Sequence, residues 1–95
     1  MQPSVSKDLQ RNFRAAVDDA RARRHEYLTL EHLLLAIARD KKGAEVLRGA
    51  GADPKKLAPE LERFLDETFE PLPEGDDRAP TETIGVRRVL ARAAM

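Results

Sequence analysis

Cysteine is absent from the sequence, and aromatic residues make up only 4% of its 95 residues. Without cysteine, the chain has no disulfide framework, no thiolate zinc site and no cysteine nucleophile. The longest apolar run, Leu33 to Ala38, is six residues long, far short of the roughly 20 that a helix needs to cross a bilayer. The amino terminus shows no basic segment followed by an apolar stretch, so we expect no secretory signal and a cytoplasmic location.

Net charge is also absent, because 17 Lys and Arg residues balance 17 Asp and Glu residues. Binding to a phosphate backbone needs a basic face, and here acidic and basic residues are interspersed along the chain. The composition therefore argues against a nucleic-acid-binding protein. Hydrophobic residues make up 41% of the sequence, which is enough for a helical core.

Apolar residues at steps of three and four predict five helices. Good N-cap residues precede four of them, and Pro54 follows Asp53 at the first helical position, where proline is tolerated. The stretch Asp40 to Gly43 is typical of a break between helices. The predicted helices are Lys7–Arg24 after Ser6, a helix after Thr29, Ala44–Ala50, a helix after Asp53, and a last helix after Thr81 or Thr83 that ends at Met95.

The same spacing predicts which side chains face the core. The helix after Thr29 carries the widest apolar arc and should be the most buried, so Leu34→Ala is expected to cost about 2–5 kcal/mol if Leu34 lies in the core. The expected inward residues are Leu9, Phe13, Ala16, Val17 and Ala20 in the first helix, Val46 and Leu47 in the third, Leu57, Leu61, Phe64, Leu65 and Thr68 in the fourth, and Ile84, Val86, Val89, Leu90 and Ala93 in the last.

Catalytic motifs are incomplete throughout the sequence. Lys41-Lys42-Gly43 lacks the first glycine and the hydroxyl residue of a phosphate-binding loop, and Thr29 replaces the histidine that a zinc-protease helix would need. His25 and His32 are the only imidazoles, and with Asp66 they leave a metal-dependent hydrolase as the least favoured alternative. The favoured interpretation places His25 in a partly exposed turn and His32 against the first helix or on a backbone carbonyl. We expect no cofactor.

The segment Arg23 to Ala36, with the sequence RRHEYLTLEHLLLA, closely resembles the signature of the amino-terminal domain of Clp-family AAA+ ATPases. Its His-Glu-Tyr form is similar to the ClpA type. The resemblance continues in the same order along nearly the whole chain, through Ala44–Arg48, Leu57–Glu67, Pro71–Pro73 and Thr83–Ala93.

The resemblance implies an all-α fold, a small helical bundle built as a pseudo-repeat of four-helix halves. Residues 1–70 would form the first Clp N repeat, and 81–95 the first helix of a second repeat that is truncated early. The stretch 71–80, rich in proline and charge, reads as a mobile linker between them. With the later helices missing, the stripe of Val86, Val89 and Leu90 would have few partners to cover it.

The resemblance also implies a non-catalytic docking domain of an ATP-dependent unfoldase rather than an enzyme. Its partners would be protein substrates and a ClpS-type adaptor of N-degron degradation and, in the full-length protein, an AAA+ hexamer and a ClpP-type peptidase. By motif position, the adaptor contacts would be Glu26, Glu31, Thr83 and Arg88, whose polar side chains suit an exposed interface. The alternative is a free-standing helical interaction module that self-associates through Val86, Val89 and Leu90.

Overall fold

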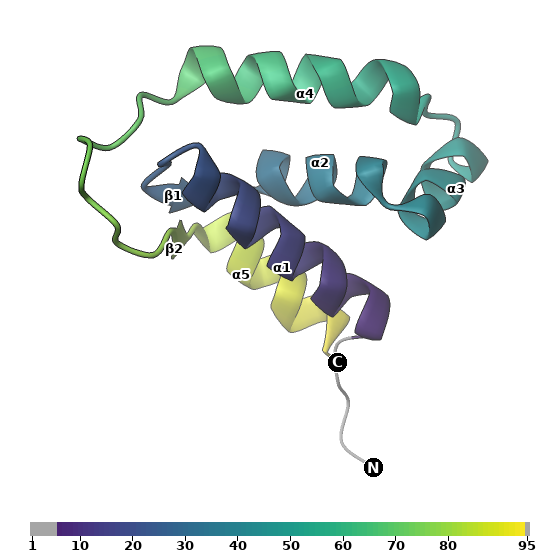
Figure 1. Ribbon diagram of the computed structural model, residues 1–95. Coiled ribbons are helices and arrows are strands. Elements are labelled where there is room, and N and C mark those ends of the chain that lie inside the picture. Colours follow the sequence, from purple (N-terminus) through teal and green to yellow (C-terminus); the bar gives the residue numbers. More distant parts are fainter. Residues whose placement is uncertain (1–5, 95) are drawn as a thin grey trace.

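The computed structural model describes residues 6–94, which form five α-helices and one pair of very short β-strands (Figure 1). The fold is therefore all-α, as predicted. In chain order the elements are α1 (Lys7–Ala22), β1 (Tyr27–Leu28), α2 (Leu30–Arg39), α3 (Lys41–Gly49), α4 (Pro54–Thr68), β2 (Thr81–Glu82) and α5 (Ile84–Ala93). The predicted end of the last helix at Met95 and the amino-terminal residues 1–5 lie outside the described residues.

The predicted N-caps are confirmed, because each cap side chain accepts a hydrogen bond from a backbone N–H of the first turn. Ser6 accepts from Leu9 N–H, Asp53 from Lys55 N–H, and Thr83 rather than Thr81 from Val86 N–H. At α2 the bonds are reciprocal, since Thr29 Oγ1 accepts from His32 N–H while the imidazole accepts from Thr29 N–H. Local sequence alone thus determines where four of the five helices begin.

The third helix differs from the prediction at its start and on its inner face. The break between α2 and α3 is Asp40 alone, which is the C-cap of α2 and the N-cap of α3, and its carboxylate accepts from Gly43 N–H at 3.0 Å. The helix α3 therefore begins at Lys41 rather than at Ala44. Gly43 packs directly on the backbone of Ile37, where a larger side chain would collide. Val46 was expected to face inward and is instead 70% exposed. In α3 the buried residues are Gly43 and Ala44, which lie in the first turn, next to the Asp40 cap.

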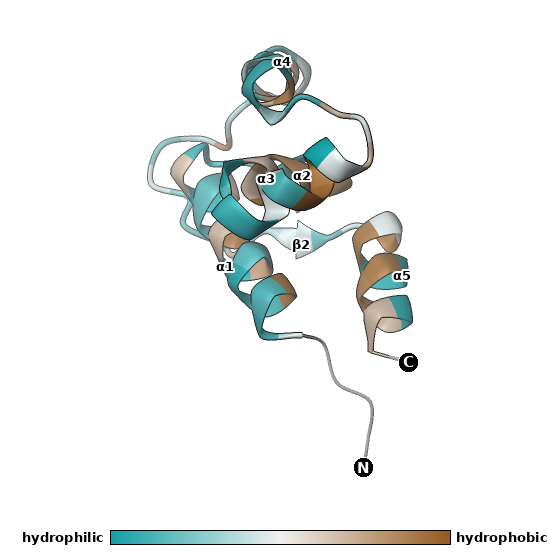
Figure 2. Ribbon diagram, turned by 90° about the vertical axis from the view of Figure 1, so that its right-hand side faces the viewer, coloured by the Kyte–Doolittle hydropathy of each residue, from teal (hydrophilic) through white to brown (hydrophobic). Residues whose placement is uncertain are grey.

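Helix α2 forms the central layer of the molecule. Figure 2 shows α4 on one side of α2, and α1 and α5 on the opposite side. Eight of the buried hydrophobic residues form two clusters, one on each side of α2. Ala16, Ala20, Leu28, Leu33 and Val86 make the first cluster, and Leu35, Leu61 and Leu65 make the second. The prediction that α2 is the most buried helix is confirmed, but Phe64 and Thr68 of α4 are exposed rather than inward-facing.

Strands β1 and β2 pair in parallel, with Tyr27 opposite Thr81 and Leu28 opposite Glu82. The sequence analysis did not predict this pair. The proline-rich stretch before β2 is also bonded to the first half of the chain, because Leu72 N–H donates to the Arg24 carbonyl at 2.7 Å. The backbone hydrogen bonds at Leu72 and in β2 attach both ends of this stretch to the first half of the chain. The prediction that 71–80 is a linker between two repeats stays a prediction.

Helix α5 packs on the core mainly through Val86. Val86 has no exposed surface and packs in the cluster with Ala16, Leu28 and Leu33, so the prediction of an uncovered stripe is wrong at this position. Leu90 packs against the same cluster, whereas Ile84 is 69% exposed and Val89 is 38% exposed. Fewer side chains of α5 therefore face the core than the sequence predicted. Strand β2 directly precedes α5 and brings only the first turns of this helix against the core.

This packing makes a direct prediction about α5. We expect Val86→Ala to lower the free energy of unfolding by about 2 kcal/mol, because it removes two buried methyl groups from a closed cluster. The matched variant Ile84→Ala removes an exposed side chain of the same helix and should change stability by less than about 0.5 kcal/mol. Urea denaturation of both variants measures the difference. Equal effects would show that α5 is not docked as described.

Within the part of the chain that the structure describes, no helix has both the length and the apolar character to span a bilayer.

Candidate partner-binding site

The parallel strand pair brings together two segments that are more than fifty residues apart in sequence. Thr81 N–H donates to the Glu26 carbonyl at 2.9 Å, and Thr83 N–H donates to the Leu28 carbonyl at 3.1 Å. Thr83 therefore lies beside the start of α2, whose first turn carries Glu31. Glu26 lies at the opposite end of the pair. Three of the four residues assigned by the resemblance thus flank one short sheet, from two separate segments.

Glu26 precedes β1 and keeps part of its carboxylate in solvent. Its Oε1 lies 3.5 Å from Nη1 of Arg78, and its side chain is 44% exposed. Asp76 holds the same guanidinium through hydrogen bonds of 2.6–3.1 Å, and these bonds keep the pKa of the Asp76 carboxyl below its usual range. Sequence reasoning missed Arg78. The signal was its position as the only cation between Glu70 and Pro80.

Glu31 lies in the first turn of α2, where the positive end of the helix dipole favours a carboxylate. It borders a groove of about 300 Å³ between α2 and α5. The rest of the lining is aliphatic, namely Leu30, Leu33, Leu34, Ile37 and Val89. Leu30 and Val89 are both more than one-third exposed, so apolar surface on both sides of this groove remains in contact with solvent.

Thr83 and Arg88 belong to α5 and its cap. The Thr83 hydroxyl accepts from Val86 N–H at 3.4 Å, so its role in the structure is to start the helix. Arg88 is exposed and makes no hydrogen bond or ion pair with the described residues. The structure therefore places Thr83 next to the strand pair and leaves Arg88 available on the surface of α5.

The two histidines form a buried pair behind this surface. His25 Nδ1 lies 2.8 Å from His32 Nε2, and the ring of Phe69 packs against both. Thr29 N–H donates to His32 Nδ1 at 3.0 Å, which makes that nitrogen an acceptor and leaves the proton of the neutral ring on Nε2. His32 Nε2–H then donates to His25 Nδ1. Both rings are therefore neutral in this arrangement.

The predicted environment of His25 is wrong, because His25 is 3% exposed rather than partly exposed. His32 bonds the other imidazole and a backbone N–H rather than a backbone carbonyl, while its packing against the first helix stays a prediction. Burial is the main cause that lowers the pKa of both rings, and it lowers the pKa of His32 to about 4. The pairing arose because the turn after α1 folds His25 back beneath α2.

The metal alternative required Asp66 beside the two histidines. Asp66 is instead bonded to the guanidinium of Arg23, and its side chain is mostly exposed. Among residues 6–94, no group of three or more His, Cys, Asp and Glu side chains is arranged so that it could hold a metal ion. The hydrogen bond between His25 and His32 accounts for why the two imidazoles lie together.

Comparisons with known proteins agree on one family. Residues 4–95 match the model of the Clp repeat (R) N-terminal domain. The chain is 38% identical over 96 residues to the ClpA homolog protein of Fuscovulum blasticum, covering 98% of this chain and 12% of that protein. It is 39% identical over 57 residues to the chloroplastic chaperone protein ClpC2 of Oryza sativa subsp. japonica, covering 58% of this chain and 6% of that protein. The chain thus spans a small share of the length of these relatives.

Proposed function

Because the chain belongs to the Clp repeat (R) N-terminal domain family, we propose that it docks a ClpS-type adaptor and protein substrates for a ClpA-like, ATP-driven unfoldase. The family is that of a regulatory amino-terminal domain, not of the ATPase module itself. In this proposal the chain performs no chemistry. The AAA+ hexamer and a ClpP-type peptidase act on what it delivers, in the cytoplasm.

The observation that carries the proposal is the α2–α5 groove with a charged residue at its edge. Protein interfaces combine an apolar centre with a polar rim, and this groove has aliphatic walls with Glu31 beside them. Leu30 and Val89 supply exposed apolar surface on the two sides of the groove. A folded partner could therefore bury this surface, while the isolated chain keeps polar residues around it.

The charges near the groove support recognition of a specific partner. Glu31 is supported by the helix dipole, and Arg88 has no ion pair among the described residues. Charges at a rim steer association and exclude wrong partners more than they add affinity. Glu26 lies at the far end of the strand pair, where Arg78 restrains its carboxylate. We propose Glu26, Glu31, Thr83 and Arg88 as the adaptor contacts.

Calorimetric titration with a purified ClpS-type adaptor tests the proposal. We expect the unmodified chain to bind, and the Glu26→Ala/Glu31→Ala variant to bind roughly tenfold more weakly, because it removes both acidic contacts. The matched control is Glu45→Ala/Glu60→Ala, which removes the same charge from exposed positions on α3 and α4. This control should bind as the unmodified chain does.

Two outcomes would contradict the proposal. Absence of binding by the unmodified chain would remove the adaptor as its partner, and equal affinity of the two double variants would remove Glu26 and Glu31 from the interface. A molecular mass that rises with concentration in the same samples would instead favour the self-associating module.

A further inference from the structure

Residues 69–80, here called the strap, run from the end of α4 to β2 and pass over the histidine pair (Figure 1). The ring of Phe69 packs on both imidazoles, and its centroid lies 5.5 Å from that of His25 and 6.1 Å from that of His32. His25 also lines a hollow of about 520 Å³ whose other lining includes strap residues from Leu72 to Arg78. The strap is therefore part of the cover that keeps the two imidazoles away from water.

The strap and β2 are attached to the first half of the chain through the segment that carries His25. Their backbone hydrogen bonds to that half all reach residues 24–28, and so does the ion pair of Arg78 with Glu26. The bonds run from Leu72 N–H to the Arg24 carbonyl (2.7 Å), from Thr81 N–H to the Glu26 carbonyl (2.9 Å) and from Thr83 N–H to the Leu28 carbonyl (3.1 Å). A movement of residues 24–28 therefore disturbs every one of these attachments.

The position of residues 24–28 depends on the ring of His25. The turn before this ring contains Arg24 with a φ of 57°, a conformation that residues other than glycine seldom adopt. Among the described residues, the side chain of His25 makes one hydrogen bond, which its Nδ1 accepts from His32 Nε2–H at 2.8 Å. This bond holds the ring beneath α2, and with it the whole segment.

A further proton on either ring breaks a bond of the pair. The two nitrogens that carry no proton are both acceptors, because His25 Nδ1 accepts from His32 and His32 Nδ1 accepts from Thr29 N–H. A proton must occupy one of these two nitrogens. A charged imidazole is also costly to bury, so the protonated ring gains by moving out toward water.

The charged groups around the pair do not offset this cost. They come from every element packed around it, namely Asp19, Arg21, Arg23 and Arg24 in and after α1, Glu31 in α2, Asp66 in α4, and Asp76, Asp77 and Arg78 in the strap. Asp19, Asp66 and Asp76 are each bonded to an arginine of this group. Within the described part of the chain, no carboxylate forms a hydrogen bond with either imidazole.

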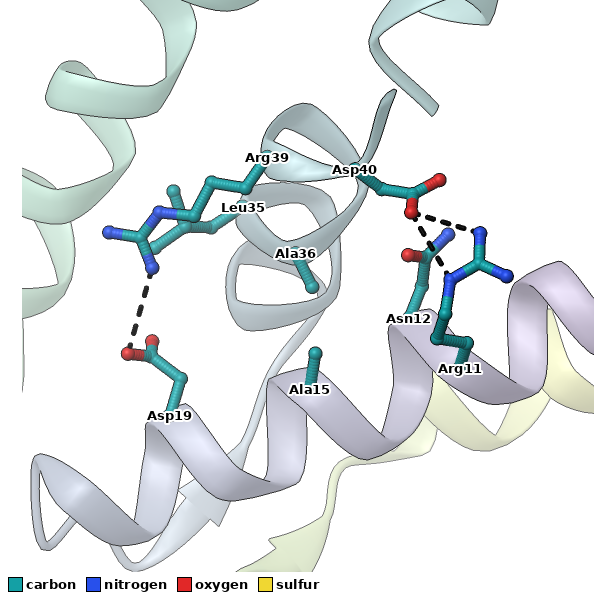
Figure 3. Close-up of a pocket in the computed structure, with 8 residues that line it drawn as sticks. All are labelled: Arg11, Asn12, Ala15, Asp19, Leu35, Ala36, Arg39 and Asp40. Carbon is teal, nitrogen blue, oxygen red and sulfur yellow. Dashed lines mark hydrogen bonds and ion pairs between the residues drawn. The ribbon is translucent and has the colours of Figure 1, made fainter. Parts of the chain in front are cut away.

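The other helices are joined to one another without the strap. Figure 3 shows two of these connections between α1 and α2, where Arg11 donates to Asp40 at 2.9 and 3.2 Å and Arg39 lies 3.8 Å from Asp19. The guanidinium of Arg39 also bonds Glu62 of α4. None of these pairs involves residues 69–94, so they survive if that part of the chain moves away.

The strap and α5 also contribute little to the buried core. No residue of the strap is fully buried, and Val86 is the one buried residue of α5. The buried residues of the second cluster all belong to α2 and α4. Segments with few buried apolar contacts open at a lower free energy than the rest of a fold. The strap, β2 and α5 are thus the part of the chain that can detach while α1–α4 stay packed.

We propose that the histidine pair is a pH-dependent switch, in which protonation breaks the His25–His32 bond, frees residues 24–28 and detaches the strap, β2 and α5 from a folded α1–α4 body. Opening takes the α2–α5 groove apart, because Val89 of α5 is one of its walls. Acid therefore removes this groove before the chain unfolds. The switch is a property of the fold and does not depend on which partner the groove binds.

The sign follows from the proton affinities of the closed and open states. Burial is the main cause that lowers the pKa of both rings in the closed state, and it lowers the pKa of His32 to about 4. In the open state the rings face water and their pKa returns to the ordinary value of 6.5. The closed state is therefore fully favoured above pH 6.5 and loses stability relative to the open state as the pH falls toward 4.

Amide hydrogen exchange of the full chain, followed by NMR between pH 7 and pH 5, tests the proposal. We expect the amides of Leu72, Thr81 and Thr83 to be less protected than that of Leu65 in α4, because they exchange from the open state. Their protection, corrected for the intrinsic effect of pH, should fall at least about tenfold from pH 7 to pH 5. Equal protection of these amides and Leu65 would overturn the proposal, because the chain would then open only as a whole.

The variant His25→Gln/His32→Gln tests whether the imidazoles are the groups that titrate. A glutamine at position 32 keeps the capping box of α2, because its side chain can accept from Thr29 N–H. The strap amides of this variant should show the same protection at pH 7 and pH 5. The matched control Glu74→Gln changes an exposed strap residue and should keep the full pH dependence. Strap protection that falls with acid in the double variant, or that does not change with pH in the unmodified chain, would overturn the switch, and the second result does not require the variant to fold.

Discussion

Leu35→Ala is expected to lower the free energy of unfolding by about 2–5 kcal/mol, the largest loss from any single side chain of α2. Leu35 is 1% exposed and packs in one cluster with Leu61 and Leu65 of α4, so its removal takes a whole buried side chain out of that cluster. Helix α2 contacts α1, α3, α4 and α5. Because it is the element that the two core clusters share, a cavity beside it weakens the whole fold.

The matched variant is Leu34→Ala, which changes the next residue in the same way. Leu34 packs only partly against the second cluster and borders the α2–α5 groove, so its removal should cost clearly less than that of Leu35. Urea denaturation monitored by circular dichroism measures both. A larger loss for Leu34 would mean that α2 is rotated about its axis relative to the structure.

Leu34 and Leu35 show which features of α2 could be predicted from the sequence and which could not. The start of α2 at Thr29 could be predicted, because a cap depends on local hydrogen bonds. Which of Leu33, Leu34 and Leu35 is most buried could not, because apolar side chains surround the helix and periodicity gives no preferred face. The orientation of α2 is set by its contacts with α1 and α4, which come from distant parts of the chain.

The strand pair and the histidine pair were beyond prediction for a similar reason. Strands of two residues carry no periodic signal, and the pairing of Tyr27 with Thr81 is a contact between distant segments. The turn before β1 requires a positive φ of 57° at Arg24, which is uncommon for a residue other than glycine. The resemblance named Glu26 and Thr83, but only the structure shows that the segments carrying them are paired.

The histidine pair should make the fold sensitive to acid between pH 6.5 and about 4. The folded state holds His32 neutral down to about pH 4, because burial and then the charge of His25 oppose its protonation, while Asp19 and Glu31 offset this only in part. The unfolded chain binds a proton at the ordinary pKa of 6.5. Stability is therefore fully present above pH 6.5 and falls as the pH drops, by about 3 kcal/mol for His32 by pH 4.

His25 adds to the loss in the same direction. Its pKa is lowered by burial and by the charge of Arg23, against the opposing charges of Asp19 and Asp66. Geometry gives the reason, because a second proton on the pair would set two N–H groups against each other across the 2.8 Å contact. Neither ring can accept that proton without breaking the bond to the other or the bond to Thr29 N–H.

The window from pH 7 to pH 5 separates the histidines from the carboxylates, whose lowered pKa values act at lower pH. In that window urea denaturation should show stability falling with acid, and NMR titration of the imidazole signals should show His32 still neutral at pH 5. The variant His25→Gln/His32→Gln has no imidazole and should show nearly constant stability over the same range. An unmodified chain whose His32 titrates near pH 6.5 would contradict the buried pair, because a ring that protonates freely cannot act as donor to His25 and acceptor from Thr29 at once.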